Sequence, residues 1–578
     1  MNIRHTAILL FALPVTALAQ KEDDQIGNEV VNVVKPYTPT ISDAFKVKET
    51  PPVEDPDNVR KTDVKYNIFS YPVASTFTPS KGRAASVDKT PQESLYRNFA
   101  TVGIGNYGTA MAELFVTADV GENSYVGGMF RHLSSQGGIE EVELEDSFHN
   151  TSLDLTYGMR GNTFSWNVDA GYQLQGYNWY GLPENFGEIL SDEARRDLIN
   201  SIEPQHSFHN AYAAGKLSFG ESIFDELSVK FNRFWDSYES EENRFFAKPK
   251  LSFEINDTRI KTDFIVDYVG TKFKGAFDFG ESLAFGFTNI GVHPSFNYQR
   301  DDWSINFGAA AFYSMDMENE DNKFFIYPQV NASLKLVGDL MIFYAGAEGT
   351  LEQNSYREFT NLNPYLAPFM GIAPTDRQYD IFAGLKGKLA SSVSYNLRGS
   401  YVNERNRPMF ISNPYTEDDT NENYGFGNSF GVVYDDMRTI SFFGELKADF
   451  SKSVSFGING TFSNYSVDEQ AEAWNLPALR VGSSIDVDIT PKWYAGAQVF
   501  FVGERKDFRD NLSVLESKNL VTLDAYFDAN AHVGYKHNDR LTGFIRVNNI
   551  ANQMYEKCLD YPVQGIQGII GASYKFDF

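Results

Sequence analysis

The sequence predicts an all-β fold: a transmembrane antiparallel β-barrel of about 22 strands, preceded by a non-globular N-terminal segment. Three observations carry this prediction. The chain ends in a strand with one continuous apolar face, many earlier segments alternate between apolar and polar residues, and the connections between them alternate between short and long. Together these features are typical of barrels that cross a membrane.

The last strand, Gln567–Phe578, separates its side chains cleanly between two faces. Ile569, Gly571 and Ser573 fall on the face expected to line the lumen. The opposite, lipid-facing set is Ile570, Ala572, Tyr574, Phe576 and Phe578. An apolar outer face with aromatic residues at the rim is typical of bacterial outer-membrane barrels. We interpret Tyr574, Phe576 and Phe578 as a C-terminal signal for insertion by the barrel-assembly machinery.

Strand-like alternation continues upstream of this terminal strand. Residues 153–157 place Leu153, Leu155 and Tyr157 on one face. Residues 440–450 and 521–533 are likewise predicted strands, with their charged residues directed into the lumen. A charged side chain that faced lipid would be costly, so these polar faces indicate a lumen.

The connections fix the predicted topology. Short turns lie near residues 160–163, 299–302, 337–340, 390–393, 451–453, 490–492 and 536–539. Long connections are predicted at 134–149, 176–205, 354–377, 404–437, 465–478, 503–519 and 551–567. Short periplasmic turns and long extracellular loops indicate that both termini are periplasmic, which requires an even number of strands. A soluble propeller or repeated sandwich is disfavoured because no fixed internal repeat is visible.

Three regions are predicted. Residues 1–19 resemble a secretory signal peptide, with Arg4 and His5 before an apolar stretch and a small-x-small site at Ala17–Ala19. Residues 20–98 are rich in proline and charge and are expected to be extended in the periplasm. The barrel is expected to span residues 99–578, in the cell outer membrane.

Composition excludes several classes of protein. The mean hydropathy is −0.36, and after the N-terminal stretch no apolar run reaches the length of a membrane-spanning helix. The net charge of −27 argues against nucleic acid as a partner. A single cysteine, Cys558, rules out a disulfide framework. We expect no cofactor, and no sequence motif indicates an activated nucleophile, so an enzyme is not expected.

The C-terminal region resembles TonB-dependent outer-membrane receptors. The resemblance rests on Arg546–Tyr555, on Tyr561–Gly565 and on the final strand, and Gln564 stands where that family usually has a second proline. It implies a 22-stranded barrel that takes part in uptake across the outer membrane. It also implies a folded plug domain ahead of the barrel, but the proline-rich residues 20–98 do not fit one. We therefore expect the lumen to be filled by the N-terminal segment, by infolded loops or by a partner protein.

One N-terminal stretch has alternating valines after an acidic residue, as in a TonB box that adds a strand to a periplasmic partner. It consists of Glu29, Val30, Val31, Asn32, Val33 and Val34. A docking strand for another periplasmic protein, or a chance apolar patch, are the alternatives. Acidic residues at 316–322 and 417–423, and His149, His206 and His209, are more simply explained as solvated or hydrogen-bonded groups than as metal ligands.

Three predicted loops have compositions that indicate a role. Residues 191–202 are predicted to form a short helix capped by Ser191, serving as a lid or as a dock for a surface lipoprotein. Residues 361–370 and 406–415 are rich in proline and aromatics, which predicts rigid contact surfaces. Three functions follow from these features: a transporter resembling TonB-dependent receptors, a structural subunit of an outer-membrane assembly or secretion complex, or a passive porin.

Overall fold

The computed structural model describes residues 96–578, except for 221, 256–257, 276–281, 416–421 and 511–517. These residues all belong to the second of the chain's two units, residues 85–578. They form a 22-stranded antiparallel barrel, two small two-stranded sheets and two short helices. No helix in this described part is long and apolar enough to cross a membrane.

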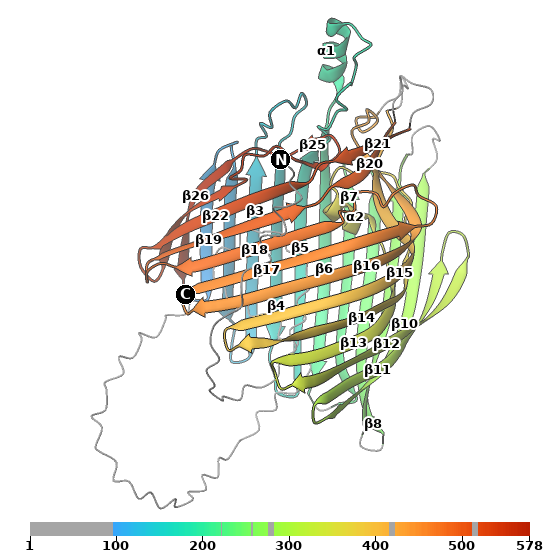
Figure 1. Ribbon diagram of the computed structural model, residues 1–578, viewed down its shortest axis with the longest axis vertical. Helices are drawn as coiled ribbons and strands as arrows, with labels where there is room; N and C mark the ends of the chain where they lie inside the picture. Colours follow the sequence, from blue (N-terminus) through green and yellow to red (C-terminus); the bar gives the residue numbers. More distant parts are fainter. Residues whose placement is uncertain (1–95, 221, 256–257, 276–281, 416–421, 511–517) are drawn as a thin grey trace, which may run out of the picture. The chain divides into compact units, whose positions relative to one another are not determined.

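The barrel strands are long on one side and short on the other (Figure 1). Its first eleven strands are β1 (Asn98–Gly105), β2 (Ala110–Asp119), β3 (Ser124–Ser135), β4 (Phe148–Met159), β5 (Phe164–Asn178), β6 (Gln205–Phe219), β7 (Phe224–Asp236), β8 (Glu241–Ile255), β9 (Thr258–Phe273), β10 (Leu283–Arg300) and β11 (Trp303–Asp316). The others are β12 (Asn322–Val337), β13 (Met341–Glu352), β14 (Thr375–Ala390), β15 (Val393–Ser412), β16 (Phe430–Ser451), β17 (Val454–Val467), β18 (Leu479–Asp488), β19 (Trp493–Val502), β22 (Tyr526–Lys536), β23 (Leu541–Asn548) and β26 (Gln567–Phe576).

The remaining elements lie in the loops. They are the helices α1 (Asp192–Ser201) and α2 (Tyr356–Leu362), the hairpin of β20 (Arg505–Asp510) with β21 (Lys518–Leu523), and the hairpin of β24 (Glu556–Cys558) with β25 (Tyr561–Pro562). The prediction of about 22 strands is confirmed, and so is the capped helix, since the Ser191 side chain accepts a hydrogen bond from the Ala194 N–H.

The barrel closes where the first strand pairs with the last. β1 and β26 are antiparallel neighbours, with Gly103 opposite Gly571 and Ile104 opposite Ile570. Two glycines face each other at this seam, and the ideal Cβ of a residue replacing Gly571 would lie 2.4 Å from the Val102 carbonyl oxygen. The closed hydrogen-bonded ring leaves the sheet without an edge strand.

The wall has an apolar outer face and a polar inner face, as predicted. On β4, Leu153, Leu155 and Tyr157 are 45%, 52% and 45% exposed, and on β26 Ile570 is 59% exposed whereas Ser573 is buried. The inward face carries paired charges, including Arg131 with Asp154, Lys248 with Asp263, and Arg398 with Asp380. Such pairing reduces the cost of placing charges inside a barrel.

Aromatic side chains gather at the end of the barrel that has the short turns. Tyr157 and Trp166 pack edge to face at 5.5 Å, and Trp493 lies 4.8 Å from Tyr535 between ring centroids. Tyr574 stacks on Phe576, which packs edge to face against Phe578. This belt is typical of a membrane–water interface. The predicted insertion residues therefore lie in it, although their role as a signal stays a prediction.

The opposite, long-loop end carries seven loops that matter below. They are L2 (136–147), L3 (179–204), L7 (353–374), L8 (413–429), L9 (468–478), L10 (503–525) and L11 (549–566), numbered in chain order among all loops at this end. Two predictions about this end were wrong. Residues 406–412 belong to strand β15, because the strands on this side extend well beyond the predicted loop boundary. The predicted strand 521–533 is broken after Leu523, since β21 leaves the barrel to pair with β20.

We expect Leu155→Arg to destabilise the barrel by about 2–4 kcal/mol, because the new charge would face lipid. The free energy of unfolding in phospholipid vesicles, from denaturant titrations, measures this effect. The matched control is Thr156→Arg, whose side chain would enter the lumen opposite Asp169. Equal losses in the two variants would contradict the assignment of inner and outer faces.

Candidate functional site

At the long-loop end of the barrel, side chains from several loops pack into a large hydrophobic cluster, which we call the mouth cluster. Its buried residues come from L2, L3, L7, L8, L10 and L11, from the inner face of β6, β7 and β9, and from the first residue of β16. The buried members are Leu144, Tyr180, Phe186, Ile199, Ile202, Phe208, Phe234, Val269, Phe273, Tyr356, Phe359, Leu366, Met370, Ile372, Phe426, Phe430, Leu523, Leu559 and Tyr561. Loops that are distant in sequence thus share one hydrophobic core.

L7 packs against the inner wall of the barrel. Its helix α2 begins after Ser355, whose side chain accepts a hydrogen bond from the Glu358 N–H at 3.2 Å. Tyr356 is fully buried, and its ring lies 5.1–5.2 Å from the rings of Phe273 and Phe234 on the inner wall. Leu366, further along the loop, is also fully buried. L7 is therefore packed against the inside of the barrel wall.

Two buried carboxylates on the wall hold L7 in place. Glu242 of β8 accepts hydrogen bonds from the Tyr356 N–H at 2.6 Å, the Arg357 N–H at 3.3 Å and the Thr271 hydroxyl at 2.9 Å. Asp236 of β7 accepts one from the Tyr356 hydroxyl at 2.7 Å. Backbone N–H donors at the start of a helix favour a negative charge beside them. These contacts offset the desolvation of the two carboxylates.

An arginine extends this connection across the wall. The Arg244 guanidinium binds Asp267 of β9 through two bonds of 2.7 and 2.9 Å, and it binds Glu358 of α2 at 2.6 Å. The planar fork of arginine suits such a bridge between two carboxylates. Strands β8 and β9 and helix α2 are therefore linked by one charged group.

Tyr561 in L11 is the residue at which four loops meet. Its ring stacks on Tyr365 of L7 at 3.7 Å and lies 4.8 Å from Tyr180 of L3. Its hydroxyl donates to the Asn428 carbonyl of L8 at 2.5 Å. Burial raises the pKa of Tyr561 well above its ordinary value, so the hydroxyl keeps its proton and remains a donor.

A second set of hydrogen bonds joins L3 to L8 and to L11. The Asn428 side chain donates to the Trp179 and Asn423 carbonyls, each at 2.9 Å, and the Tyr180 hydroxyl donates to the Pro562 carbonyl at 2.9 Å. Asn428 is fully buried, so these bonds satisfy a side chain that would otherwise be costly to bury. No local pattern indicates a role for Asn428, because its partner Trp179 lies far away in the chain.

Gln564, which replaces the family's usual proline, also connects elements. Its side-chain amide donates to the Ser135 hydroxyl at 2.8 Å and to the Gly137 carbonyl at 3.2 Å. Its carbonyl accepts a bond from the Asn549 side chain at 2.9 Å. A proline could not make the amide contacts. Gln564 therefore ties L11 to the end of β3 and to L2.

Two buried aspartates stabilise the junction of L10 with its neighbours. Asp507 accepts bonds from the Ser412 N–H at 3.1 Å and from the Asn475 side chain at 2.8 Å. Asp560 of L11 is paired with Arg509 of L10. Burial raises the pKa of Asp507 to about 6 and that of Asp560 to about 7, so both carboxyls titrate within the physiological range.

The predicted site residues are only partly brought together. The segment Glu29–Val34 lies outside the described residues. His206 is buried, with Nε2 at 3.6 Å from Asp236 Oδ2, whereas His209 stacks on Trp235 and binds the Tyr172 hydroxyl. Three positions apart on one strand, the two histidines fall on opposite faces. Among the described residues, no group of three or more His, Cys, Asp or Glu side chains is arranged to hold a metal ion.

The prediction for residues 361–370 was wrong. This proline- and aromatic-rich stretch was expected to be a contact surface, but Leu366, Ala367 and Met370 are buried in the barrel mouth. The same composition suits a rigid surface and a rigid core. Whether such a stretch forms a surface or a core depends on the position of the loop relative to the barrel wall, which the local sequence does not determine.

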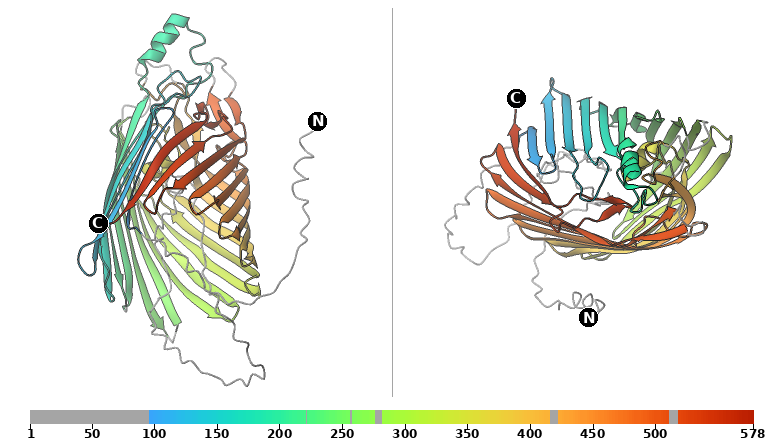
Figure 2. Two further views of the ribbon diagram at one scale, coloured as in Figure 1. Left: turned by 90° about the vertical axis from the view of Figure 1, so that its left-hand side faces the viewer. Right: turned by 90° about the horizontal axis from the view of Figure 1, so that it is seen from above.

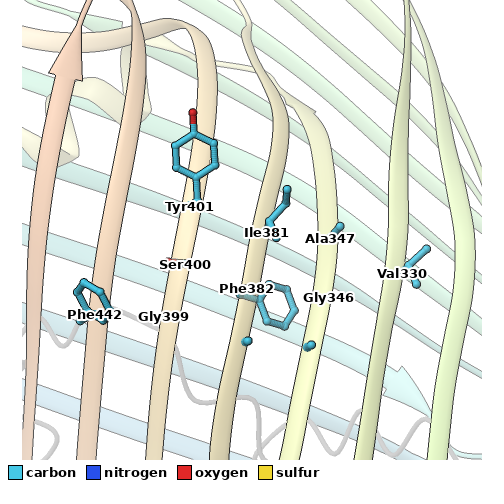
Figure 3. A pocket seen from close by; sticks show the side chains of 11 residues that line it. Val330, Gly346, Ala347, Ile381, Phe382, Gly399, Ser400, Tyr401 and Phe442 are labelled. Carbon is cyan, nitrogen blue, oxygen red and sulfur yellow. The ribbon is translucent and has the colours of Figure 1, made fainter.

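A groove of about 700 Å³ lies on the apolar outer face of β12–β16 (Figure 3). Its floor is a row of small residues on neighbouring strands, with Ala345 opposite Ala383 and Ala383 opposite Gly399. Phe442 closes one end of this row and is 62% exposed. Since the outer face is directed away from the lumen, the groove does not belong to the mouth.

We expect Tyr561→Ala to loosen the mouth cluster by about 3–5 kcal/mol, because it removes a large buried ring shared by four loops. Tyr561→Phe keeps the ring and leaves the Asn428 carbonyl without its donor, at a cost of about 1–3 kcal/mol. Amide hydrogen exchange in L3, L7 and L8 measures both effects. Unchanged protection of these loops in Tyr561→Ala would contradict the central position of Tyr561.

We expect the junction of L10 and L11 to be more stable at pH 5 than at pH 8. The pKa of Asp560 is about 7 in the folded loop and about 4 in an unfolded chain. The folded junction therefore binds an additional proton between these values, and its stability falls as the pH rises through that window. Hydrogen exchange in L11, corrected for intrinsic rates, tests this. Asp560→Asn should reduce the difference, and an undiminished difference in that variant would contradict it.

No model of a known protein family matches the chain, and no curated protein matches its sequence. Solved structures match its fold. The ferric-catecholate import receptor Fiu from Escherichia coli K12 has a TM-score of 0.59 at 10% identity, over 84% of this chain and 82% of that one. The siderophore receptor PirA from Acinetobacter baumannii has a TM-score of 0.61 at 13% identity, over 83% and 80%.

The pyoverdine outer membrane receptor FpvA from Pseudomonas aeruginosa PAO1 has a TM-score of 0.61 at 12% identity, over 84% of this chain and 79% of that one. At such low identity these likenesses establish the fold alone. The chain therefore has the 22-stranded barrel fold of outer-membrane receptors.

Proposed function

We propose that this protein is an outer-membrane transport barrel, resembling TonB-dependent receptors, whose outer entrance is closed by its own loops. The observation that carries the proposal is the anchoring of L7 inside the wall by Glu242, Asp236 and Arg244. The fold shared with Fiu, PirA and FpvA supports transport in preference to catalysis. With short turns periplasmic, the mouth cluster lies at the cell's outer surface.

The width of the barrel favours a lumen that is filled. A ring of 22 strands encloses a lumen too wide for wall side chains alone to fill, so a barrel of this size either conducts or is plugged. The proline-rich composition of residues 20–98 does not fit a folded plug. L7, in contrast, is packed and hydrogen-bonded at the mouth. We infer that the loops close the lumen. A closed lumen argues against a passive porin.

The N-terminal region completes the proposal. We infer that residues 1–19 direct export, that residues 20–98 remain periplasmic, and that Glu29–Val34 engages TonB or another periplasmic protein as an added strand. We further infer that the apolar wall contacts outer-membrane lipid. The barrel-assembly machinery recognises the aromatic C-terminus during insertion. A surface lipoprotein is a further proposed partner of the outer loops.

The alternative role is a structural subunit of an outer-membrane assembly or secretion complex. It is favoured by the extensive hydrogen bonding of the mouth, which suits a permanently closed barrel as well as a gated one. Deletion of Glu29–Val34 separates the two roles. Loss of energy-coupled uptake would support transport, whereas loss of a co-purifying assembly partner with uptake unchanged would support the structural role.

We expect removal of L7 to open the barrel. Glu352 and Thr375 face each other across β13 and β14, so a two-residue Asn-Gly turn can replace residues 353–374 and keep the hairpin. In planar lipid bilayers, the wild type should show little steady current and the shortened protein a large one. The control shortens residues 316–321, which lie outside the mouth cluster. A closed barrel after removal of L7 would show that another element fills the lumen.

A further inference from the structure

Part of loop L3 projects beyond the ends of the strands. We call this part, residues 189–201 with helix α1, the arm. Helix α1 stands above the rim in two perpendicular views (Figures 1 and 2). The turn just before the helix presents Ile189 and Leu190, which are 83% and 40% exposed. Because the arm lies beyond the barrel wall, lipid in contact with the wall does not account for these exposed apolar side chains.

The arm is held firmly at its base. Ile199 and Ile202 are buried in the mouth cluster. The Arg195 guanidinium binds both oxygens of Glu143 in L2 and also donates to the Phe186 carbonyl at 2.8 Å. The fixed geometry suits recognition of a partner, since little ordering entropy remains to be lost on binding.

The surroundings of the arm are strongly acidic. L2 and L3 together contain eleven aspartate and glutamate residues and two arginines, and Arg195 is already engaged by Glu143. The exposed carboxylates are Glu140, Glu141, Glu143, Glu145, Glu184, Glu188, Asp192, Glu193, Asp197 and Glu203. Such a field attracts a cationic partner and repels an anionic membrane surface. The arm is therefore not suited to lying on lipid headgroups.

A hollow at the base of the arm can receive a side chain of the partner. It has a volume of about 520 Å³ and lies where L2, L3 and L8 meet the connection between β7 and β8. Glu145 and Glu203 line it, together with Tyr238 and Asn423. Carboxylates beside an aromatic ring suit a lysine or arginine side chain.

We propose that the arm of L3 and the adjoining L2 form a docking surface for an extracellular protein with a basic face. Ile189 and Leu190 supply the apolar contact, and the hollow lined by Glu145 and Glu203 receives a cationic side chain. The proposal rests on the outer orientation of the long-loop end. It does not depend on which solute the barrel transports or on whether L7 opens.

Binding of a fluorescein-labelled peptide of alternating lysine and leucine to the full-length protein in detergent tests this proposal. We expect Ile189→Ser with Leu190→Ser to weaken binding about tenfold, chiefly through faster dissociation. Glu145→Gln with Glu203→Gln should weaken it at least about fivefold, chiefly through slower association. Binding should fall as salt is added. A peptide with glutamate in place of lysine should not bind.

The matched control is Glu318→Gln with Glu320→Gln, which removes the same charge from the exposed turn between β11 and β12. This variant should bind within about twofold of the wild type, because both residues lie outside the arm. If it weakens binding as much as the L2 and L3 variant, the attraction is non-specific and the proposal is overturned. Unchanged binding in both arm variants would overturn it as well.

Discussion

The constraint on which the structure depends is that a backbone crossing lipid must satisfy all its hydrogen bonds within the protein. A sheet meets this requirement by closing on itself, and here β1 and β26 complete the ring. Closure fixes the remaining features of the wall. One face of every strand must be apolar and the other may carry charge, so exposed Leu155 and inward Asp154 are adjacent residues. The aromatic belt then marks the rim of the bilayer.

Closure of 22 strands also creates a wide lumen, which has to be filled. The protein places L7 against the inner wall and holds it with charged groups. Burying Glu242 would be costly for an unpaired carboxylate. Two backbone N–H groups and a hydroxyl offset this cost, and Arg244 adds a charged link to α2. A hydrophobic core alone is non-directional, whereas these hydrogen bonds fix the position of the loop.

The long loops have two different environments, a buried one in the mouth cluster and an exposed one at the arm. Tyr561, Tyr365 and Tyr180 bury their rings in a shared core and make the mouth one cooperative unit. The tip of L3 leaves that core, with Ile189 exposed and carboxylates around it. L2 and L3 together hold eleven of the chain's 77 acidic residues, on the surface that we propose as a docking site. The net charge of the sequence did not reveal this, because it could equally have been distributed through the lumen.

The sequence by itself determined the local pattern: the strand number, the inner and outer faces of β4 and β26, the short turns, and the helix capped by Ser191. These features depend on alternation and capping, which act between near neighbours. The tertiary structure alone decided that Leu366, Ala367 and Met370 of the stretch 361–370 are buried and that β21 leaves the barrel. It also decided the roles of Asn428, Tyr561 and Gln564. Some of their partners are hundreds of residues away in the chain. The same residue types occur on exposed surfaces and in buried junctions, so their role is determined only when the folded barrel brings the partners together.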